Sequence, residues 1–112
     1  MKNHFIEIRS LNLKPNTRAE FQRLYIEEAL PLLKRWNFDV VAHGPSLHDE
    51  NIYYVIRRFD SLAQREQSED AYYASDDWRQ GPRERILALI ENYTDIVLKL
   101  DEDTVQGLRK KS

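Results

Sequence analysis

The chain has 112 residues, of which 17 are Lys or Arg and 19 are Asp or Glu, so its formal net charge at pH 7 is −2. This length predicts a single domain with one modest core, and the near-neutral charge offers no attraction for nucleic acid or an anionic membrane surface. The sequence has no Cys, which excludes disulfides, thiolate zinc sites and a cysteine nucleophile. No apolar run approaches the roughly 20 residues of a membrane span. Charges interrupt the N-terminal segment, so we expect no signal peptide and a cytoplasmic protein.

The first third of the chain predicts a strand followed by an interrupted helix. Residues 4–12 alternate apolar and polar side chains, as a half-buried strand does. A turn at residues 14–16 precedes Thr17 and Glu20, which have the spacing of a helix capping box. Apolar residues then recur at three- and four-residue steps, which is typical of a helix with one buried face. Because Pro31 removes a backbone donor, we expect a kink or break in this helix, close to the residue before the proline.

The middle of the chain predicts a β-hairpin over residues 38–59. Residues 52–59 are rich in β-branched and aromatic side chains and form the strongest strand pattern in the sequence. A polar, turn-forming loop separates this strand from another expected at 38–43. Simple alternation in that earlier strand places three apolar residues on one face: Phe38, Val40 and Ala42.

Two further helix starts follow the hairpin. Ser61 and Gln64 have capping-box spacing and predict a helix running towards Tyr73. Ser75 precedes two acidic residues, a pattern that favours the N-terminus of another helix. Gly81-Pro82 then interrupts the helical stretch, and the proline can begin a further helical segment.

The C-terminal part predicts a short helix, a strand and a tail. Residues 94–100 alternate in the manner of a last strand, and residues 101–112 are expected to be a polar, mobile tail. The helix after Gly81-Pro82 has an apolar face that we assign to four residues: Ile86, Leu87, Ile90 and Tyr93.

The predicted order is βαββαβ, the pattern of a ferredoxin-like α+β domain over residues 1–100. The favoured topology is a four-stranded antiparallel sheet with the helices on one face. Because the strands carry apolar side chains on both sides, the uncovered face predicts two subunits pairing sheet to sheet as a dimeric α+β barrel. The alternative is a monomer whose second face is covered by the kinked helix and the tail.

Two segments make the sequence similar to a known family. They are Leu30-Pro31-Leu32-Leu33-Lys34 and Trp78-Arg79-Gln80-Gly81-Pro82-Arg83-Glu84, and Glu7-Ile8-Arg9, Leu13-Lys14-Pro15 and the stretch 58–63 support them. With these segments the chain resembles the NIPSNAP family, within the wider dimeric α+β barrel group, from residue 5 to about residue 100. Asn16 stands where the family often has Gly, and Asn tolerates the same turn.

The resemblance implies a homodimeric barrel with a cleft between sheet and helices, but no single activity. Family members are mostly uncharacterised. Related barrels include cofactor-free monooxygenases, haem-degrading enzymes, small-molecule isomerases and binding proteins, and a shared fold does not supply a mechanism.

Three residues are candidates for catalysis. His43, at the end of a predicted strand, could act as a general base or haem ligand, or could simply be a strand-end histidine held by one hydrogen bond. Tyr54 and Arg58 share one face of the strand at 52–59, and Tyr53 and Arg57 share the other. An Arg beside a Tyr in a cleft would bind a carboxylate or enolate oxygen. Alternatively, one pair faces the helices and the other forms ion pairs between subunits.

Three further residues are candidates for ligand binding. Tyr25, Trp78 and Arg83 would supply aromatic walls and a cation to the mouth of the cleft. The alternative is structural, because large aromatic side chains usually serve packing. In that case Trp78 anchors the broken helix and Arg83 pairs with a nearby carboxylate such as Glu84.

Two functional hypotheses follow. The first is a small-molecule enzyme, a cofactor-free oxygenase or isomerase acting on an apolar or aromatic compound, with His43, Tyr54 and Arg58 polarising the substrate. The second is a non-catalytic binding or structural homodimer. The sequence has no P-loop, dinucleotide, zinc-peptidase or serine-hydrolase motif, and no closely spaced metal ligands, so we predict neither a cofactor nor a metal.

Overall fold

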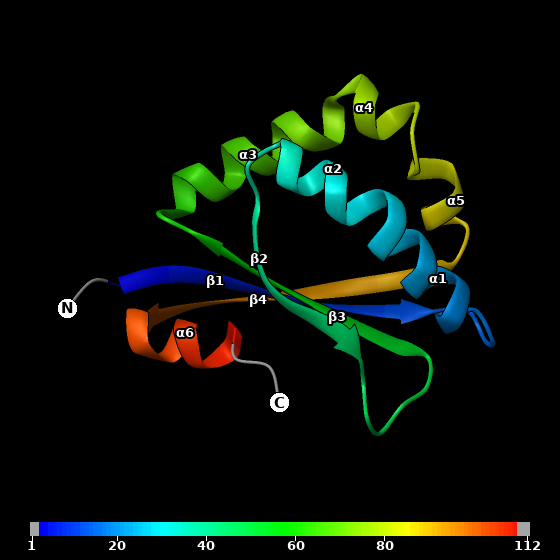
Figure 1. The fold of residues 1–112 in the computed structure, drawn as a ribbon, viewed down its shortest axis with the longest axis horizontal. Helices are drawn as coiled ribbons and strands as arrows, with labels where there is room; N and C mark the ends of the chain where they lie inside the picture. The colour runs from blue at the N-terminus through cyan, green and yellow to red at the C-terminus, as the bar shows by residue number, and fades with distance from the viewer. Residues whose placement is uncertain (1–2, 110–112) are drawn as a thin grey trace.

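The computed structural model describes residues 3–109, and its centre is one antiparallel sheet. The strands lie in the order β2-β3-β1-β4. Figure 1 shows them with most of the helices on one side. This is the predicted ferredoxin-like α+β topology, which is confirmed. The strand bounds are β1 Asn3–Leu13, β2 Asp39–Pro45, β3 Ile52–Phe59 and β4 Ile90–Asp101.

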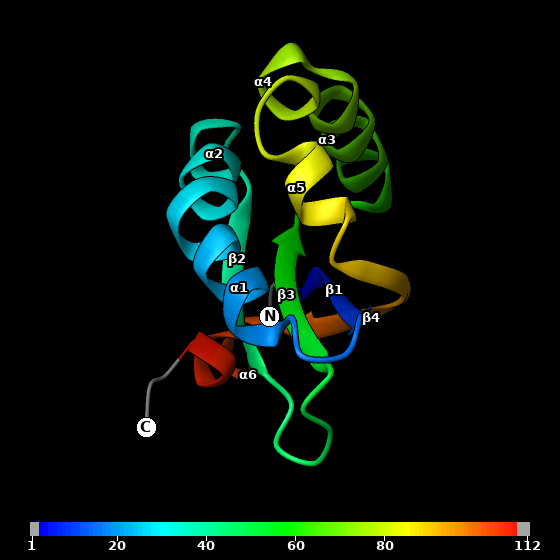
Figure 2. The same cartoon turned by 90° about the vertical axis from the view of Figure 1, so that its right-hand side faces the viewer.

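Two groups of helices cover one face of this sheet. We call the first group, from residues 18–35, the first arm, and the second, from residues 62–87, the second arm; Figure 2 shows them side by side above the strands. The first arm contains α1 Arg18–Leu24, the π-helical turn η1 Tyr25–Ala29 and α2 Leu30–Arg35. The second arm contains α3 Leu62–Ala74, α4 Asp76–Arg79 and α5 Arg83–Leu87. Within residues 3–109, no helix is long and apolar enough to cross a membrane.

The first arm is interrupted where Pro31 predicted an irregularity. The backbone N–H of Leu30 donates to the carbonyl of Tyr25, five residues earlier, so one wide turn precedes the proline. The break is therefore confirmed. The capping box is not, because the Thr17 hydroxyl donates to the Lys14 carbonyl at 2.7 Å and caps no helical N–H. Asn16 takes the left-handed conformation, with φ 65°, that the turn requires.

Side-chain caps fix the second arm as predicted. The Ser61 hydroxyl accepts from the backbone N–H of Gln64 at 3.0 Å and begins α3. The Ser75 hydroxyl accepts from the N–H of Trp78 at 3.2 Å and begins α4. The helical stretch then breaks at Gly81-Pro82, and α5 follows.

The structure corrects two predictions about the strands. In β2, Val40 pairs with Arg57 while Ala42 pairs with Ile56, so a bulge at Val41 places Val40 and Ala42 on opposite faces. Simple alternation could not foresee this extra residue. In the C-terminal half, Ile90 and Tyr93 belong to β4 and not to the preceding helix, which ends at Leu87.

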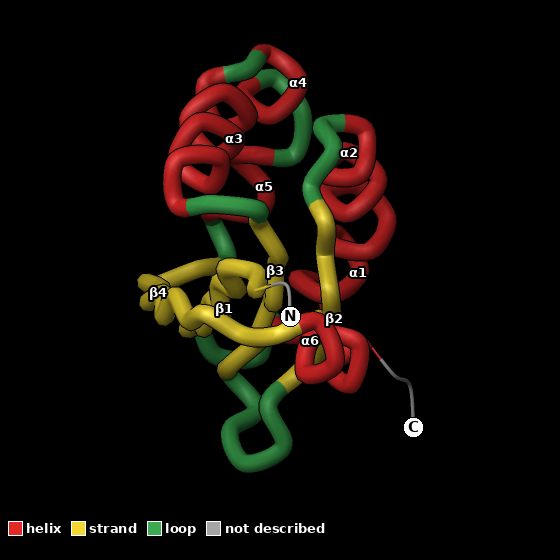
Figure 3. Tube along the Cα trace, turned by 90° about the vertical axis from the view of Figure 1, so that its left-hand side faces the viewer, coloured by secondary structure: helices red, strands yellow, loops and turns green. Residues whose placement is uncertain are grey.

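The segment predicted to be a polar tail forms helix α6, Glu102–Arg109, over its described part. Figure 3 shows α6 beneath the sheet, next to β2 and opposite the two arms. Val105 is 0% exposed and packs with Ile6, Val41 and Ile56. Glu102 lies 2.5 Å from His4, and Arg109 lies 2.6 Å from Asp39. Val105 is the only buried residue among the described residues of α6, and the residues around it are mostly polar. The sequence therefore indicated a helix with a buried face only weakly.

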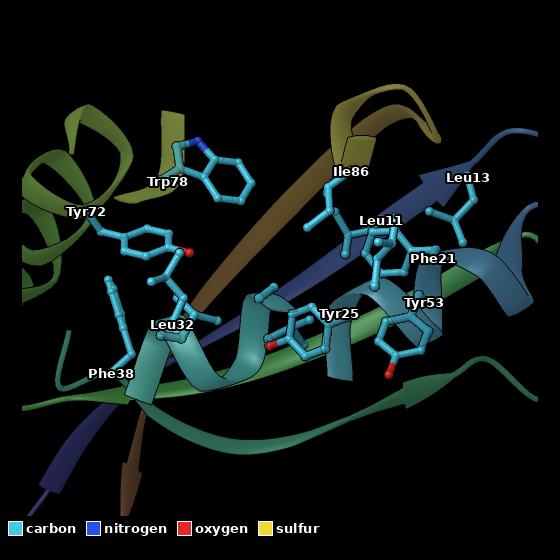
Figure 4. Packing of buried hydrophobic residues seen from close by; sticks show 14 residues of the cluster. Leu11, Leu13, Phe21, Tyr25, Leu32, Phe38, Tyr53, Tyr72, Trp78 and Ile86 are labelled. Atoms are coloured by element: carbon cyan, nitrogen blue, oxygen red, sulfur yellow. The ribbon is translucent and has the colours of Figure 1, made fainter. Parts of the chain in front are cut away.

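The main core lies between the sheet and the two arms. Figure 4 shows its aromatic side chains arriving from both arms and from the strands. The Tyr72 ring lies 5.3 Å from Phe38 and 5.6 Å from Trp78, measured between centroids. The Phe21 ring lies 5.2 Å from Tyr53 on β3. Edge and tilted contacts of this kind add specific geometry to the burial of apolar surface.

Gly81 allows the tight break between α4 and α5, because a Cβ at this position would collide with the carbonyl oxygen of Asp77. We expect Gly81→Ala to lower the free energy of unfolding by about 1–3 kcal/mol, as overpacking does. Gly107 in α6 is the matched control, since nothing lies within 4 Å of a Cβ there. Gly107→Ala should stabilise by up to about 1 kcal/mol through helix propensity. Urea denaturation of both variants tests the opposite signs, and equal effects would contradict them.

Candidate functional site

A cavity of about 360 Å³ lies between the sheet and the two arms. This volume is within the range of small-molecule sites. Leucine, isoleucine and valine side chains line much of it, together with the guanidinium groups of Arg9, Arg57 and Arg83. Its aromatic walls come from Phe21, Tyr25, Tyr72, Tyr73, Trp78 and Tyr93. The cavity therefore combines an apolar body with a few cationic groups.

Local irregularities in both arms position these walls. The π-helical turn of the first arm carries Tyr25 and Ala29, and both line the cavity. Such turns are frequent at functional sites because they redirect side chains within a helix. In the second arm the Ser75 cap and the Gly81 break hold Trp78, whose ring lies 5.4 Å from Tyr73.

Two tyrosine hydroxyls in the cavity wall have no hydrogen-bond partner among residues 3–109. They belong to Tyr25 and Tyr72, which are 5% and 1% exposed. In Figure 4 both hydroxyls point towards the middle of the cluster, one from each arm. Burial raises the pKa of both groups, so they remain protonated donors. An unpaired buried hydroxyl destabilises the fold by roughly 1–3 kcal/mol, so a ligand atom that accepts its hydrogen bond would remove this penalty.

A third hydroxyl bridges two arginines at one end of the cavity. Nη1 of Arg9 donates to the Tyr73 hydroxyl at 3.1 Å, and Nη1 of Arg57 donates to the same oxygen at 3.2 Å. The guanidinium of Arg9 also lies 4.5 Å from the ring centroid of Tyr93, a cation–π distance. Two arginines are thus held rigidly at the cavity wall.

Behind these arginines lies a group of paired charges that we call the ionic cluster. Its members come from β1, β3, α3 and β4: Glu7, Arg9, Arg57, Arg65, Glu69 and Asp95. Glu7 is 0% exposed and accepts from Nε of Arg57 at 2.9 Å and from Nε of Arg65 at 2.8 Å. Nη2 of Arg57 also donates to Glu69 at 2.9 Å. Arg9 pairs with both oxygens of Asp95, at 2.8 and 3.0 Å.

The two glutamates of the ionic cluster titrate very differently. Burial alone would raise the pKa of Glu7, but hydrogen bonding with Glu69 and the charges of Arg57 and Arg9 outweigh it and lower the pKa to about 2. Burial raises the pKa of Glu69 to about 7, helped by its hydrogen bond with Glu7 and by the negative charge of that group. The pair therefore shares one proton over much of the range between these values.

The three residues predicted to bind a ligand, Tyr25, Trp78 and Arg83, all line the cavity. They come from separate segments, the π-helical turn, α4 and α5. In the sequence, helical periodicity indicated Tyr25, and the Gly81-Pro82 break indicated Trp78 and Arg83. The fold places all three around one cavity.

The three residues predicted to be catalytic do not meet in the cavity. His43 lies on the helix-covered side of β2, where its Nδ1 is 2.7 Å from the Tyr53 hydroxyl. Tyr54 and Arg58 lie on the opposite face of the sheet. The alternation of β3 explains this, since Tyr53 and Arg57 are the pair that faces the helices.

Arg58 is engaged with its own chain on that opposite face. It lies 2.7 Å from Asp39 and 3.0 Å from Asp60, and its Nη1 lies 2.8 Å from Nδ1 of His4. The role of Arg58 in substrate binding stays a prediction.

Sequence reasoning missed most of the polar end of the cavity. Glu7 and Arg9 occupy alternate positions of β1, and both point towards the helices. Charges on the inward face of a strand were the available signal. Glu69 gave no comparable signal, because α3 is polar over much of its length. In the part of the chain that the structure describes, no group of three or more His, Cys, Asp or Glu could hold a metal ion.

Known structures share this fold. A NIPSNAP family protein of unknown function from Agrobacterium tumefaciens is 23% identical, with a TM-score of 0.79 over 87% of each chain. An uncharacterised NIPSNAP domain protein from Burkholderia xenovorans is 17% identical, with a TM-score of 0.76 over 84% of this chain and 91% of that one. A proposed antibiotic biosynthesis monooxygenase from Nitrosomonas europaea is 8% identical, with a TM-score of 0.62 over 84% of this chain and 95% of that one.

The sheet order and the helices on one face define a ferredoxin-like α+β domain, and its cavity lies between sheet and helices. The NIPSNAP family model matches residues 6–102, and this chain belongs to that family. The resemblance in the sequence is therefore confirmed. Among curated proteins, none matches the sequence significantly.

The raised pKa of Glu69 makes stability depend on pH. In the folded chain Glu69 keeps its proton up to about pH 7, whereas in the unfolded chain it releases the proton near the ordinary glutamate pKa of 4.5. The protonated Glu69 therefore contributes its full stabilisation below pH 4.5, and this contribution is lost as the pH rises through 7. The free energy of unfolding should fall by roughly 3 kcal/mol over this range. Glu69→Gln should remove this loss. Urea denaturation between pH 5 and 8, with Glu66→Gln on exposed α3 surface as control, measures it, and parallel curves for wild type and Glu69→Gln would refute it.

Proposed function

We propose that this chain binds a small apolar or aromatic molecule in the cavity between the sheet and the two arms. The observation that carries this proposal is an aromatic cavity of about 360 Å³ with two buried, unpaired hydroxyls in its wall. A packed core would fill such a space, because voids lose dispersion contacts and unpaired polar groups cost free energy. A ligand with an aromatic body and a polar group would satisfy both the walls and the hydroxyls.

Binding is the function that the geometry supports best. The likeness to proposed monooxygenases from Nitrosomonas europaea and a Bacteroides species concerns the fold, at 8% and 13% identity. An oxygenase or isomerase activity therefore stays a prediction. It would have to use the donors that line the cavity, since His43, Tyr54 and Arg58 do not line it.

Filling the cavity should weaken binding. Ala29 lines it from the π-helical turn, so Ala29→Leu should reduce the affinity for a neutral aromatic probe, 2-naphthamide, at least about tenfold by occupying its space. Isothermal titration calorimetry measures this affinity, and amide shifts of Tyr25, Tyr72 and Trp78 in NMR spectra locate the probe.

Ala63→Leu, on the exposed surface of α3, makes the same change outside the cavity and should leave the affinity unaltered. Wild-type protein that binds neither 2-naphthamide nor its carboxylate analogue 2-naphthoate, or Ala29→Leu that folds and binds equally well, would overturn the proposal.

We also propose that two copies pair through the sheet face opposite the arms, as a dimeric α+β barrel. One row across this face joins Ile56, Ile8 and Ile96 on β3, β1 and β4. Helix α6 buries Ile56, but Ile96 is 58% exposed and its neighbour Leu98 is 39% exposed. Ile96 and Leu98 therefore form an exposed apolar strip along β4. If two copies paired around a twofold axis, the strip of each copy would be covered by the other copy.

Charging this strip should prevent pairing. Ile96→Asp places an unpaired carboxylate in the proposed interface and should convert a dimer to a monomer of 13.4 kDa. Sedimentation velocity at micromolar concentration measures the mass. Ile26→Asp, at a residue 44% exposed on the first arm, is the matched control and should remain dimeric. A monomeric wild type would refute this part of the proposal.

A further inference from the structure

Arginine, tyrosine and tryptophan side chains supply the hydrogen-bonding groups of the cavity lining, and all of them can donate. Its wall contains the guanidinium groups of Arg9, Arg57 and Arg83 and four tyrosine hydroxyls, and no Asp or Glu among the described residues lines it. The hydroxyls of Tyr25 and Tyr72 are buried and unpaired within residues 3–109. Every one of these groups can donate and only the tyrosine oxygens can also accept, so the lining favours a ligand that supplies oxygen lone pairs.

Tyr73 marks where the ligand oxygen would lie. Its hydroxyl oxygen accepts from Arg9 at 3.1 Å and from Arg57 at 3.2 Å, and this leaves its own hydrogen to donate. Two cationic donors on one hydroxyl oxygen polarise the O–H bond and strengthen it as a donor. An oxyanion in the cavity would meet this donor and the positive charge of both arginines.

The carboxylates that balance these arginines lie outside the lining of the cavity. Glu7 and Glu69 contact Arg57, and Asp95 contacts Arg9, but none of the three lines the cavity. The ionic cluster holds three arginines and three carboxylates, so it is neutral when all are ionised. When Glu69 carries a proton, the cluster has one positive charge in excess beside the cavity.

We propose that the cavity selects small aromatic or apolar molecules that carry one oxyanion, a carboxylate or phenolate, and that this oxyanion and ionised Glu69 compete for the same arginines. The inference rests on the proposed function, because it names the class of ligand that the cavity takes. Binding of the anion then requires a protonated Glu69, so above neutral pH the protein takes up one proton from solvent for each anion bound.

The surroundings of Glu69 explain this competition. Four charged groups interact with Glu69 directly: Glu7 and Arg9 on β1, Arg57 on β3 and Arg65 on α3. Asp95 on β4 pairs with Arg65 and Arg9, and the Tyr73 hydroxyl on α3 accepts from Arg57 and Arg9. Burial and the neighbouring Glu7 already hold the pKa of Glu69 at about 7. A second negative charge at Arg9 and Arg57 would raise this pKa further, by the same electrostatic rule.

Two probes of the same shape test the proposal: 2-naphthoate, which is anionic throughout, and 2-naphthamide, which is neutral. Calorimetry at pH 6 and pH 8.5 measures both affinities. We expect 2-naphthoate to bind up to about 30-fold more tightly at pH 6, the ratio of the protonated fractions of a carboxyl with a pKa of about 7. The affinity for 2-naphthamide should not change with pH.

The variant Glu69→Gln removes the competing charge and should bind 2-naphthoate tightly at both pH values, whereas Glu66→Gln should keep the wild-type dependence. Thermal denaturation confirms that each variant is folded. A wild type that binds 2-naphthamide but binds 2-naphthoate weakly or without pH dependence would overturn this inference alone, and so would a pH dependence that survives in Glu69→Gln. Failure of both probes to bind would overturn the proposed function itself.

Discussion

The ion pair between Glu7 and Arg57 is the constraint on which the site depends. Both side chains are almost completely buried, on adjacent strands of the sheet, where an unpaired charge would cost several kcal/mol. Satisfying the remaining oxygen of Glu7 and the remaining N–H groups of Arg57 recruits Arg65 and Glu69 from α3. The charges therefore fix the second arm against the sheet at one point. The cavity lies next to that point, with Arg57 serving both as a member of the cluster and as part of the wall.

Such a cluster is a poor way to add stability, because desolvation offsets most of the attraction between buried charges. An apolar group of similar volume would pack as well. What the charges provide is a rigid set of donors at the cavity and a carboxyl, Glu69, whose ionisation is balanced near neutral pH. The proposed recognition of an anion would use this balance, because shifted pKa values concentrate at binding and catalytic sites.

Most sequence patterns with a local cause were read correctly, the capping box at Thr17 being the exception, and those with a distant cause were not. The caps at Ser61 and Ser75, the break before Pro31 and the strand 52–59 each depend on a few adjacent residues. The bulge at Val41 and the docking of Val105 depend on partners far along the chain. The site follows the same division. Tyr25 and Trp78 were visible in local patterns, but Glu7 meets Arg57 only through the register of two strands 50 residues apart.

Strand β3 separates the two surfaces proposed to be functional. Tyr53, Val55 and Arg57 face the arms, and Tyr54, Ile56 and Arg58 face α6 and the strip proposed to pair with a second copy. Arg57 and Arg58 are neighbours, yet one is committed to the ionic cluster and the other to Asp39 and Asp60. A shift of register by one residue would exchange the two faces of β3. The ion pairs of Arg57 and Arg58 oppose such a shift. They therefore hold β3 in the register that places Arg57 at the cavity and Ile56 on the face proposed to pair.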